Sequence, residues 1–203
     1  MKVRNVVFDV GRVLVEWDLR CLFAKLIDDP AELDWFLANV VTEQWHHQHD
    51  EGRDIRAMIT ERQDAYPDQA DRIAAYLPRF LETIPGDVPG TFGLVRRLDE
   101  SGVPLFAITN FGDTFWAQFR PTRPDLDRFR DIVVSGIENI AKPDPAIFEL
   151  GADRFGIDPR ESLFIDDKAD NIAAAEALGW RGHHFRDAET LEADLIARGL
   201  LGR

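Results

Sequence analysis

The sequence predicts an α/β protein in which a doubly wound, Rossmann-like parallel sheet carries a helical cap subdomain inserted after its first strand. Short apolar runs rich in Val, Ile, Leu and Phe alternate with segments of helical spacing along most of the chain. Such runs are typical of parallel strands buried on both faces, and their alternation with helices favours one parallel sheet. A chain of 203 residues, 45% of them hydrophobic, can bury such a core and carry a sizeable insertion.

The first strand is expected in VVFDVG, residues 6–11, and the cap follows it. Strand character is then lost, and apolar residues recur at helical spacing. Helices of the cap are expected near residues 19–26, 33–37, 55–62 and 71–80. Proline and glycine in IPGDVPG, residues 84–90, indicate the return to the core. We therefore predict a core of residues 1–16 and 89–203 and a cap of residues 17–88.

The rest of the chain is expected to alternate helix and strand. One helix opens around Pro143 and Pro145, which suit a first turn, and ends before Gly156. The other expected helices are residues 91–100, 113–119, 169–178 and 188–197, and the expected strands are residues 103–109, 131–135, 163–165 and 181–185.

The charge and composition of the chain argue against nucleic acids and membranes as binding partners. The net charge of -13 arises from 37 acidic and 24 basic residues, a balance that repels nucleic acid and anionic membranes. No run approaches the roughly 18 apolar residues of a membrane span. The single Cys21 excludes an internal disulfide, and the amino terminus lacks the apolar stretch of a secretory signal. We expect a cytoplasmic protein without nucleic-acid or membrane partners, either a monomer or a homodimer.

Polar residues stand at the carboxyl ends of the expected strands, in the order Asp9, Thr109, Asn110, Lys142, Asp166 and Asp167. In an open parallel sheet the ligand crevice lies outside those ends, so these residues are expected to converge there. Asp9 precedes Gly11, whose backbone allows close approach of a ligand. Its carboxylate can attack a phosphoryl group to give an aspartyl-phosphate, or it can cap a turn.

Each of the other polar residues has a functional and a structural interpretation. Thr109 and Asn110 can hold phosphate oxygens at a helix start, or simply cap that helix. Lys142 can offer a compact charge to the crevice, or lie in solvent. Two carboxylates 4 Å apart repel by about 4 kcal/mol at an effective dielectric near 20, so Asp9 with Asp166 and Asp167 favours a magnesium ion. A raised pKa or an ion pair to Lys142 or Lys168 is the rival solution.

Four segments in this order resemble the motifs of the haloacid dehalogenase-like hydrolase superfamily: VVFDVGRVLVEWD, FAITN, Lys142 with Pro143, and LFIDDKADNIAAAEALG. The resemblance covers nearly the whole chain, including a helical cap of the first insertion type. It implies that Asp9 is the nucleophile and a magnesium ligand, together with the Gly11 carbonyl and one or both of Asp166 and Asp167. It further implies that Thr109, Asn110 and Lys142 bind the phosphoryl group and that Asn171 orients the acidic loop.

The sequence departs from this pattern at two positions. Phosphatases of the family usually carry a second Asp, a general acid and base, where this chain has Gly11. Members with glycine there occur in the branch that this turn resembles, and a cap residue or a metal-organised water could supply the proton. Arg12 occupies a position where small residues are commoner, and it can face the phosphate or solvent.

Cap residues are expected to recognise the leaving group, and Trp17, Trp45, His49 and Arg53 are the candidates. The histidines His46, His47 and His49 allow a zinc site, but no cysteine lies nearby and a polar cap surface is the favoured interpretation.

The function expected from these observations is magnesium-dependent removal of phosphate from a small phosphorylated metabolite, with a sugar phosphate as one candidate, through an aspartyl-phosphate on Asp9. A 2-haloacid dehalogenase-type hydrolase that uses the same aspartate is one alternative, although the acidic pair favours phosphate chemistry. A non-catalytic phosphate-binding or regulatory module is another. The order of the motifs excludes a response-regulator receiver, and GxGxxG, GxxxxGK and GxSxG are absent.

Overall fold

The computed structural model describes residues 2–202 and contains one five-stranded parallel sheet in the order β3-β2-β1-β4-β5. The strands are β1 (Asn5–Phe8), β2 (Leu105–Thr109), β3 (Asp131–Val134), β4 (Ser162–Asp166) and β5 (Arg181–His184). The register places Phe8, the last residue of β1, beside both Ala107 and Ile165, so β1 is central, and its two neighbours continue to Thr109 and Asp166. The predicted fold class is confirmed.

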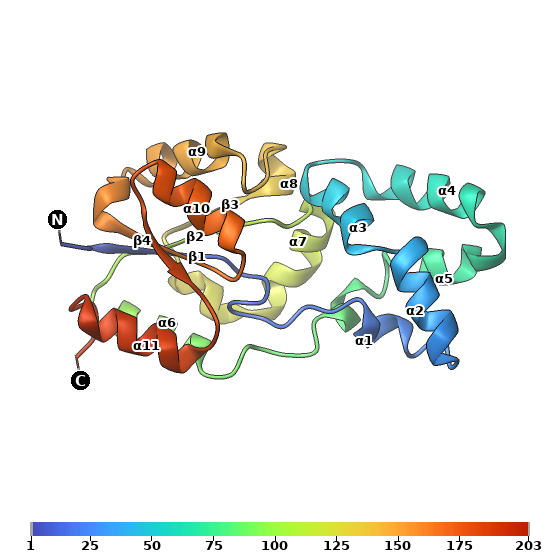
Figure 1. Ribbon diagram of the computed structural model, residues 1–203, viewed down its shortest axis with the longest axis horizontal. Coiled ribbons are helices and arrows are strands. Elements are labelled where there is room, and N and C mark those ends of the chain that lie inside the picture. The colour runs from blue at the N-terminus through green and yellow to red at the C-terminus, as the bar shows by residue number, and fades with distance from the viewer. Residues whose placement is uncertain (1, 203) are drawn as a thin grey trace.

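Helices cover both faces of the sheet (Figure 1). On one face α9 (Pro145–Phe155) and α10 (Ala169–Ala177) share an apolar cluster with Val7. On the other face α6 (Thr91–Glu100) and α11 (Ala188–Ala197) share a second cluster with Val6 and Phe8. Alternate residues of β1 therefore bury their side chains in opposite cores, which is why the strand has no polar face.

The segment between β1 and α6 is helical and lies beyond the carboxyl ends of the strands (Figure 1). Its elements are α1 (Arg20–Phe23), α2 (Pro30–Asn39), α3 (Glu43–Asp50), α4 (Ile55–Ala65), η1 (Pro67–Gln69), α5 (Ala70–Ala75) and η2 (Phe80–Thr83). We call residues 17–88 the cap, and their division from the core stays a prediction. Cap residues such as Phe36 and Tyr76 belong to the same apolar cluster as Phe8.

The chain enters and leaves the cap through two adjacent segments. Val88 N donates to Leu14 O at 2.9 Å, Glu16 N donates to Gly86 O at 2.9 Å, and Asp18 N donates to Thr83 O at 2.9 Å. We call these two hydrogen-bonded segments, residues 14–18 and 83–88, the neck. The neck joins the helices of the cap to the core: residues 14–18 follow β1 and Asp9, and residues 83–88 lead to α6.

Sequence periodicity located most core elements but fewer cap elements. The remaining elements are α7 (Asp113–Phe119), η3 (Arg120–Thr122), η4 (Pro124–Arg128), α8 (Ser135–Glu138) and η5 (Pro159–Glu161). The helix expected over residues 71–80 is wrong in its second half, because α5 ends at Ala75 and η2 begins at Phe80. The helix α3 was not expected, and Thr42 starts it by accepting a hydrogen bond from Trp45 N at 2.9 Å.

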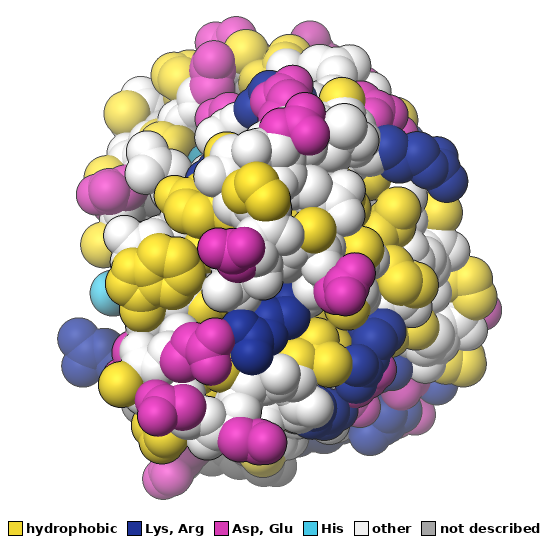
Figure 2. Space-filling view, turned by 90° about the vertical axis from the view of Figure 1, so that its right-hand side faces the viewer, with side chains coloured by type: hydrophobic (Ala, Val, Ile, Leu, Met, Phe, Trp, Pro, Cys, Tyr) yellow, Lys and Arg dark blue, Asp and Glu magenta, His cyan; other side chains and the backbone are white. Residues whose placement is uncertain are grey.

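Across residues 2–202, no helix combines the length and the apolar character needed to cross a membrane. Figure 2 views the molecule from the cap end, where Lys and Arg side chains lie among Asp and Glu side chains. Ion pairs of the cap include Arg20 with Asp34 and Lys25 with Glu82.

Candidate active site

A cavity of about 340 Å³ lies between the strand ends and the cap. The core lines it with Asp9, Gly11, Arg12, Val15, Asn110, Phe111, Lys142, Asp167, Lys168 and Asn171. The cap lines it with Trp17, Glu43, Gln44, His46, His47, Asp50, Phe80 and Ile84. The convergence expected from the strand-end residues is therefore present for Asp9, Asn110, Lys142 and Asp167.

Lys142 links two carboxylates at the floor of this cavity. Its Nζ lies 2.9 Å from Asp9 Oδ1 and 2.7 Å from Asp166 Oδ2, and the residue is only 2% exposed. The amide of Val10 also donates to Asp9 Oδ1, at 2.7 Å. Burial opposes protonation of Lys142, but the charges of Asp166 and Asp9 raise its pKa, so the ammonium form is held there.

Asn110 holds the backbone of Lys142 in place. Its Nδ2 donates to Lys142 O at 2.8 Å, and its Oδ1 accepts from Lys142 N at 2.8 Å. Both ends of the amide are thus used to fix the lysine, although Asn110 still borders the cavity. The sequence suggested that the Asn110 amide binds phosphate oxygens. In the structure the amide instead positions Lys142.

Asp166 is surrounded by donors, whereas Asp167 borders the cavity. Asn171 Nδ2 lies 2.9 and 3.0 Å from the two carboxylate oxygens of Asp166, and Lys168 N donates to Oδ1 at 2.8 Å. Asn171 therefore contacts the acidic loop, and the role of orienting that loop stays a prediction. Burial, followed by the charge of Asp166, raises the pKa of Asp167.

Three carboxylates gather around one point: ligand oxygens of Asp9, Asp166 and Asp167 lie within 4.8 Å of one another. Burial raises the pKa of Asp9 to about 7, the charges of Asp166 and Asp167 add to the rise, and Lys142 opposes it. Lys142 is the cation in direct contact with this group, through Asp9 and Asp166, while Arg12 and Lys168 act on Asp167 from further away. An all-oxygen donor set of this charge suits a hard divalent cation.

Arg12 bridges the core loop and the cap. Its Nη2 lies 2.5 Å from Glu43 Oε1 of α3, and its guanidinium carbon lies 5.0 Å from the Trp17 ring centroid. Arg12 and Trp17 both line the cavity. Arg12 therefore borders the cavity with its guanidinium paired to the cap, and its contact with a ligand stays a prediction.

Several expected site residues lie outside the cavity lining, among them Thr109, Trp45 and Arg53. Thr109 is fully buried, and its Oγ1 has no hydrogen-bond partner within residues 2–202. Trp45 packs against Tyr76 with ring centroids 5.8 Å apart, and Arg53 pairs with Glu61. The expectation that Trp45, His49 and Arg53 touch the leaving group is corrected. The helix α3 turns Trp45 toward the apolar cluster, His49 is buried against Phe115, and Arg53 lies beyond the helix end.

The residues that sequence reasoning missed lie on the opposite side of the same helix. Glu43, His46, His47 and Asp50 follow the i, i+3, i+4, i+7 spacing of one helical face, and all line the cavity. His46 and Asp50 are buried, as is His49 behind them, so the predicted polar cap surface is wrong there. Within the described chain, Asp9 with Asp166 and Asp167 is the group of three suited to a metal, and the histidines form none.

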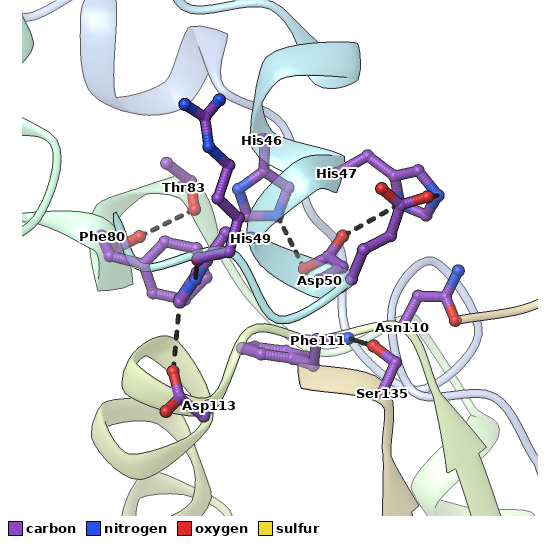
Figure 3. A network of polar contacts seen from close by, with 12 residues as sticks. His46, His47, His49, Asp50, Phe80, Thr83, Asn110, Phe111, Asp113 and Ser135 are labelled. Carbon is purple, nitrogen blue, oxygen red and sulfur yellow. Dashed lines mark hydrogen bonds and ion pairs between the residues drawn. The ribbon is translucent and has the colours of Figure 1, made fainter. Parts of the chain in front are cut away.

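Asp50 sits between two imidazoles (Figure 3). Its Oδ1 lies 3.5 Å from His46 Nε2, and its Oδ2 lies 3.4 Å from His47 Nδ1. The other ring nitrogen of His46 lies 2.6 Å from the Tyr76 hydroxyl. This network comes from the cap and faces the carboxylates of the core across the cavity.

Comparisons with known proteins agree with this geometry. Residues 4–179 match the family described as haloacid dehalogenase-like hydrolase. The chain is 27% identical over 192 residues to the sesquiterpene phosphatase astK of Aspergillus oryzae, with 91% of each protein covered. It is 28% identical over 111 residues to a glyceraldehyde 3-phosphate phosphatase of Pyrococcus furiosus, of which it spans 46%.

Among solved structures, the HAD family enzyme bt-2542 of Bacteroides thetaiotaomicron superposes with a TM-score of 0.72 at 22% identity, covering 96% of this chain and 99% of that one. The same enzyme in complex with magnesium and inorganic phosphate gives a TM-score of 0.66 at 22% identity, covering 91% and 95%. At this identity the likeness concerns the fold.

Proposed function

The chain belongs to the haloacid dehalogenase-like hydrolase family, and from that premise we propose that it hydrolyses a phosphate monoester of a small metabolite through an aspartyl-phosphate on Asp9. The observation that carries the proposal is the position of the Lys142 ammonium between Asp9 and Asp166, beside the cavity-lining Asp167. The phosphatase names of two relatives support phosphate as the group removed.

In the first step a carboxylate oxygen of Asp9 attacks phosphorus. The ammonium of Lys142 lies within hydrogen-bond distance of that carboxylate, so it can hold a phosphoryl oxygen against it and offset the charge that develops. The backbone of Gly11 borders the same space. The buried hydroxyl of Thr109, which has no hydrogen-bond partner among residues 2–202, would be a further donor for the phosphoryl group, and Asn110 would serve by fixing Lys142.

Asp9, the Gly11 carbonyl and Asp167 would hold a magnesium ion, with Asp166 beside them. The three carboxylates supply the hard oxygen ligands and the excess negative charge that this ion needs. When bound, magnesium would neutralise charge on the transferring phosphoryl group. Because Asp166 already contacts Lys142, Asn171 and Lys168 N, Asp167 is the more available carboxylate of the pair.

The test is phosphate release from p-nitrophenyl phosphate by the purified protein with magnesium. Asp9→Asn should abolish release, and a chelator should do the same to the wild type. Asp158→Asn is the matched control. Asp158 caps η5 just before β4, at the amino ends of the strands and so away from the cavity. Activity that survives Asp9→Asn, or halide release from a 2-haloacid without metal, would contradict the proposal.

A further inference from the structure

The proposed reaction needs a proton at the leaving group. When Asp9 attacks phosphorus, the bond from phosphorus to the leaving oxygen breaks, and an alkoxide is a poor leaving group unless it is protonated. Position 11, two residues after the nucleophile, is a glycine that lines the cavity. On the core side, Lys142 is held by two carboxylates, and Asp9 and Asp167 are assigned to the nucleophile and the metal.

The cap side of the cavity carries ionisable groups in a fixed arrangement. Asp50 is 5% exposed and lies between His46 and His47 on the face of α3 that lines the cavity. Figure 3 shows this carboxylate above Phe111 and Asn110, the residues that follow β2. Its Oδ1 is buried, and the nearest charged partner is His46 Nε2 at 3.5 Å, so Asp50 is held in place within the helix face.

His46 is unsuited to donate a proton to a ligand. Its Nδ1 is 2.6 Å from the Tyr76 hydroxyl, and its ring stacks on Phe115 and Phe80 at centroid distances of 5.7 and 6.2 Å. Burial lowers its pKa, which favours the neutral ring. These contacts make His46 a packed residue that supports Asp50 from behind.

His47 has the opposite surroundings. Its side chain is 35% exposed, so the ring can exchange protons with solvent. The hydrogen bond to Asp50 is the largest cause that raises the pKa of His47; the charges of Asp50 and Glu51 add to it, while burial and Lys168 oppose it. The ring therefore holds its proton more readily than an isolated histidine does, and the charge of Lys168 in the core acts against this.

We propose that His47 donates the proton to the leaving-group oxygen and that Asp50 positions it, in place of the acidic side chain missing at Gly11. The inference rests on the phosphatase function proposed above. In the first step Asp9 bonds to phosphorus, the leaving oxygen departs with its bonding electrons and takes a proton from His47, and an alcohol and a neutral imidazole result.

In the second step the neutral imidazole accepts a proton from the water that attacks phosphorus. The bond between Asp9 and phosphorus then breaks, and inorganic phosphate leaves. The carboxylate of Asp9 and the imidazolium of His47 are restored, so protons and charges balance over the cycle. Each turnover consumes one water and the phosphate ester.

The experiment compares two leaving groups in the full-length protein with magnesium. Nitrophenolate from p-nitrophenyl phosphate departs without a proton, whereas butanolate from butyl phosphate needs one. His47→Gln should lower kcat/KM for butyl phosphate by about 10²–10⁴-fold, change the value for p-nitrophenyl phosphate by less than about threefold, and remove the alkaline fall in the butyl phosphate pH profile. Gln48→Ala, one residue along α3 and outside the cavity lining, is the control.

Asp50→Asn provides the second variant and should move the alkaline fall to lower pH, because it removes the group that favours the imidazolium. Equal losses on both esters in His47→Gln, or no loss on butyl phosphate, would overturn the role of His47. A wild type that cleaves the aryl ester alone would overturn it too. Release from both esters that persists in Asp9→Asn would instead refute the proposed function.

Discussion

The Nζ of Lys142 lies 2.9 Å from Oδ1 of Asp9, and the lysine that makes this contact is almost fully buried. The buried lysine keeps its charge because the carboxylates of Asp9 and Asp166 both contact its ammonium. Removing it leaves those carboxylates without their main counter-charge, which costs more than the loss of an exposed ion pair.

Lys142→Met should therefore abolish phosphate release and lower the free energy of unfolding by about 3–5 kcal/mol at pH 8. The folded-state pKa of Asp9 is about 7, against an ordinary value of 3.8. Between these two pH values the folded state binds a proton that the unfolded state has lost, so the stability of the fold decreases as pH rises through this range. Since Lys142 lowers this pKa, its loss should be less costly at pH 5. Urea unfolding at both pH values tests this, with the exposed Lys25→Met as control; an equal loss at both would contradict it.

His47 should contribute to stability in a pH-dependent manner. Its folded-state pKa is raised above 6.5, chiefly by the hydrogen bond to Asp50. A raised histidine pKa gives stabilisation that is fully present below the unfolded value and is lost as pH rises through the folded value. The difference in unfolding free energy between wild type and His47→Gln should thus be larger at pH 5.5 than at pH 8.5. A difference independent of pH would show that Asp50 does not favour the imidazolium.

Magnesium should stabilise the folded protein. Binding to the folded state alone adds about 2.7 kcal/mol at a concentration of 100 times Kd. We expect the ion to raise the Tm of the wild type and to have a much smaller effect on Asp167→Asn. The exposed Asp170→Asn, three residues along the same segment, should respond as the wild type does. A thermal shift retained in Asp167→Asn would remove Asp167 from the proposed ligand set.

Gly136 should not tolerate a side chain. A Cβ there would lie 2.6 Å from Asp113 N and 2.8 Å from the Phe111 carbonyl oxygen, both backbone atoms. Gly136→Ala should cost about 1–3 kcal/mol and disturb the loop that carries Asn110. Gly93→Ala in α6 meets nothing within 4 Å and should stabilise by about 0.5–1 kcal/mol. Chemical unfolding of the two variants, with opposite signs expected, is the measurement.

The core half of the site could be predicted from sequence because parallel strands bring their carboxyl ends to one edge. Asp9 and Asp166 are far apart along the chain, yet they meet because β1 and β4 are neighbouring strands. Lys142 joins them from the loop between α8 and α9. Neither the hold of Asn110 on the lysine backbone nor the burial of Thr109 follows from that rule. Both depend on the paths of loops, which strand periodicity does not describe.

The cap half could not be predicted for a different reason. The segment EQWHHQHD is too polar to indicate a buried helix, and its burial depends on Tyr76, thirty residues further along, which reaches His46. Trp45 was predicted to recognise the leaving group because it is large and aromatic. The helical phase instead directs its neighbours His46 and His47 to the cavity. The i, i+3, i+4, i+7 spacing of Glu43, His46, His47 and Asp50 is the sequence signal that predicts one polar helix face directed at the cavity.

The neck restricts how the two halves of the cavity can move. Its two segments hydrogen-bond side by side at Leu14–Val88 and Glu16–Gly86; the first leads from β1 into the inserted helices, and the second leads from those helices to α6. Any rigid displacement of those helices must pivot there, carrying His47 and Asp50 as a unit while Asp9 and Lys142 stay with the sheet. The span from proton donor to nucleophile would then be set by one rotation, so ester size and turnover would respond together to substitutions at the pivot.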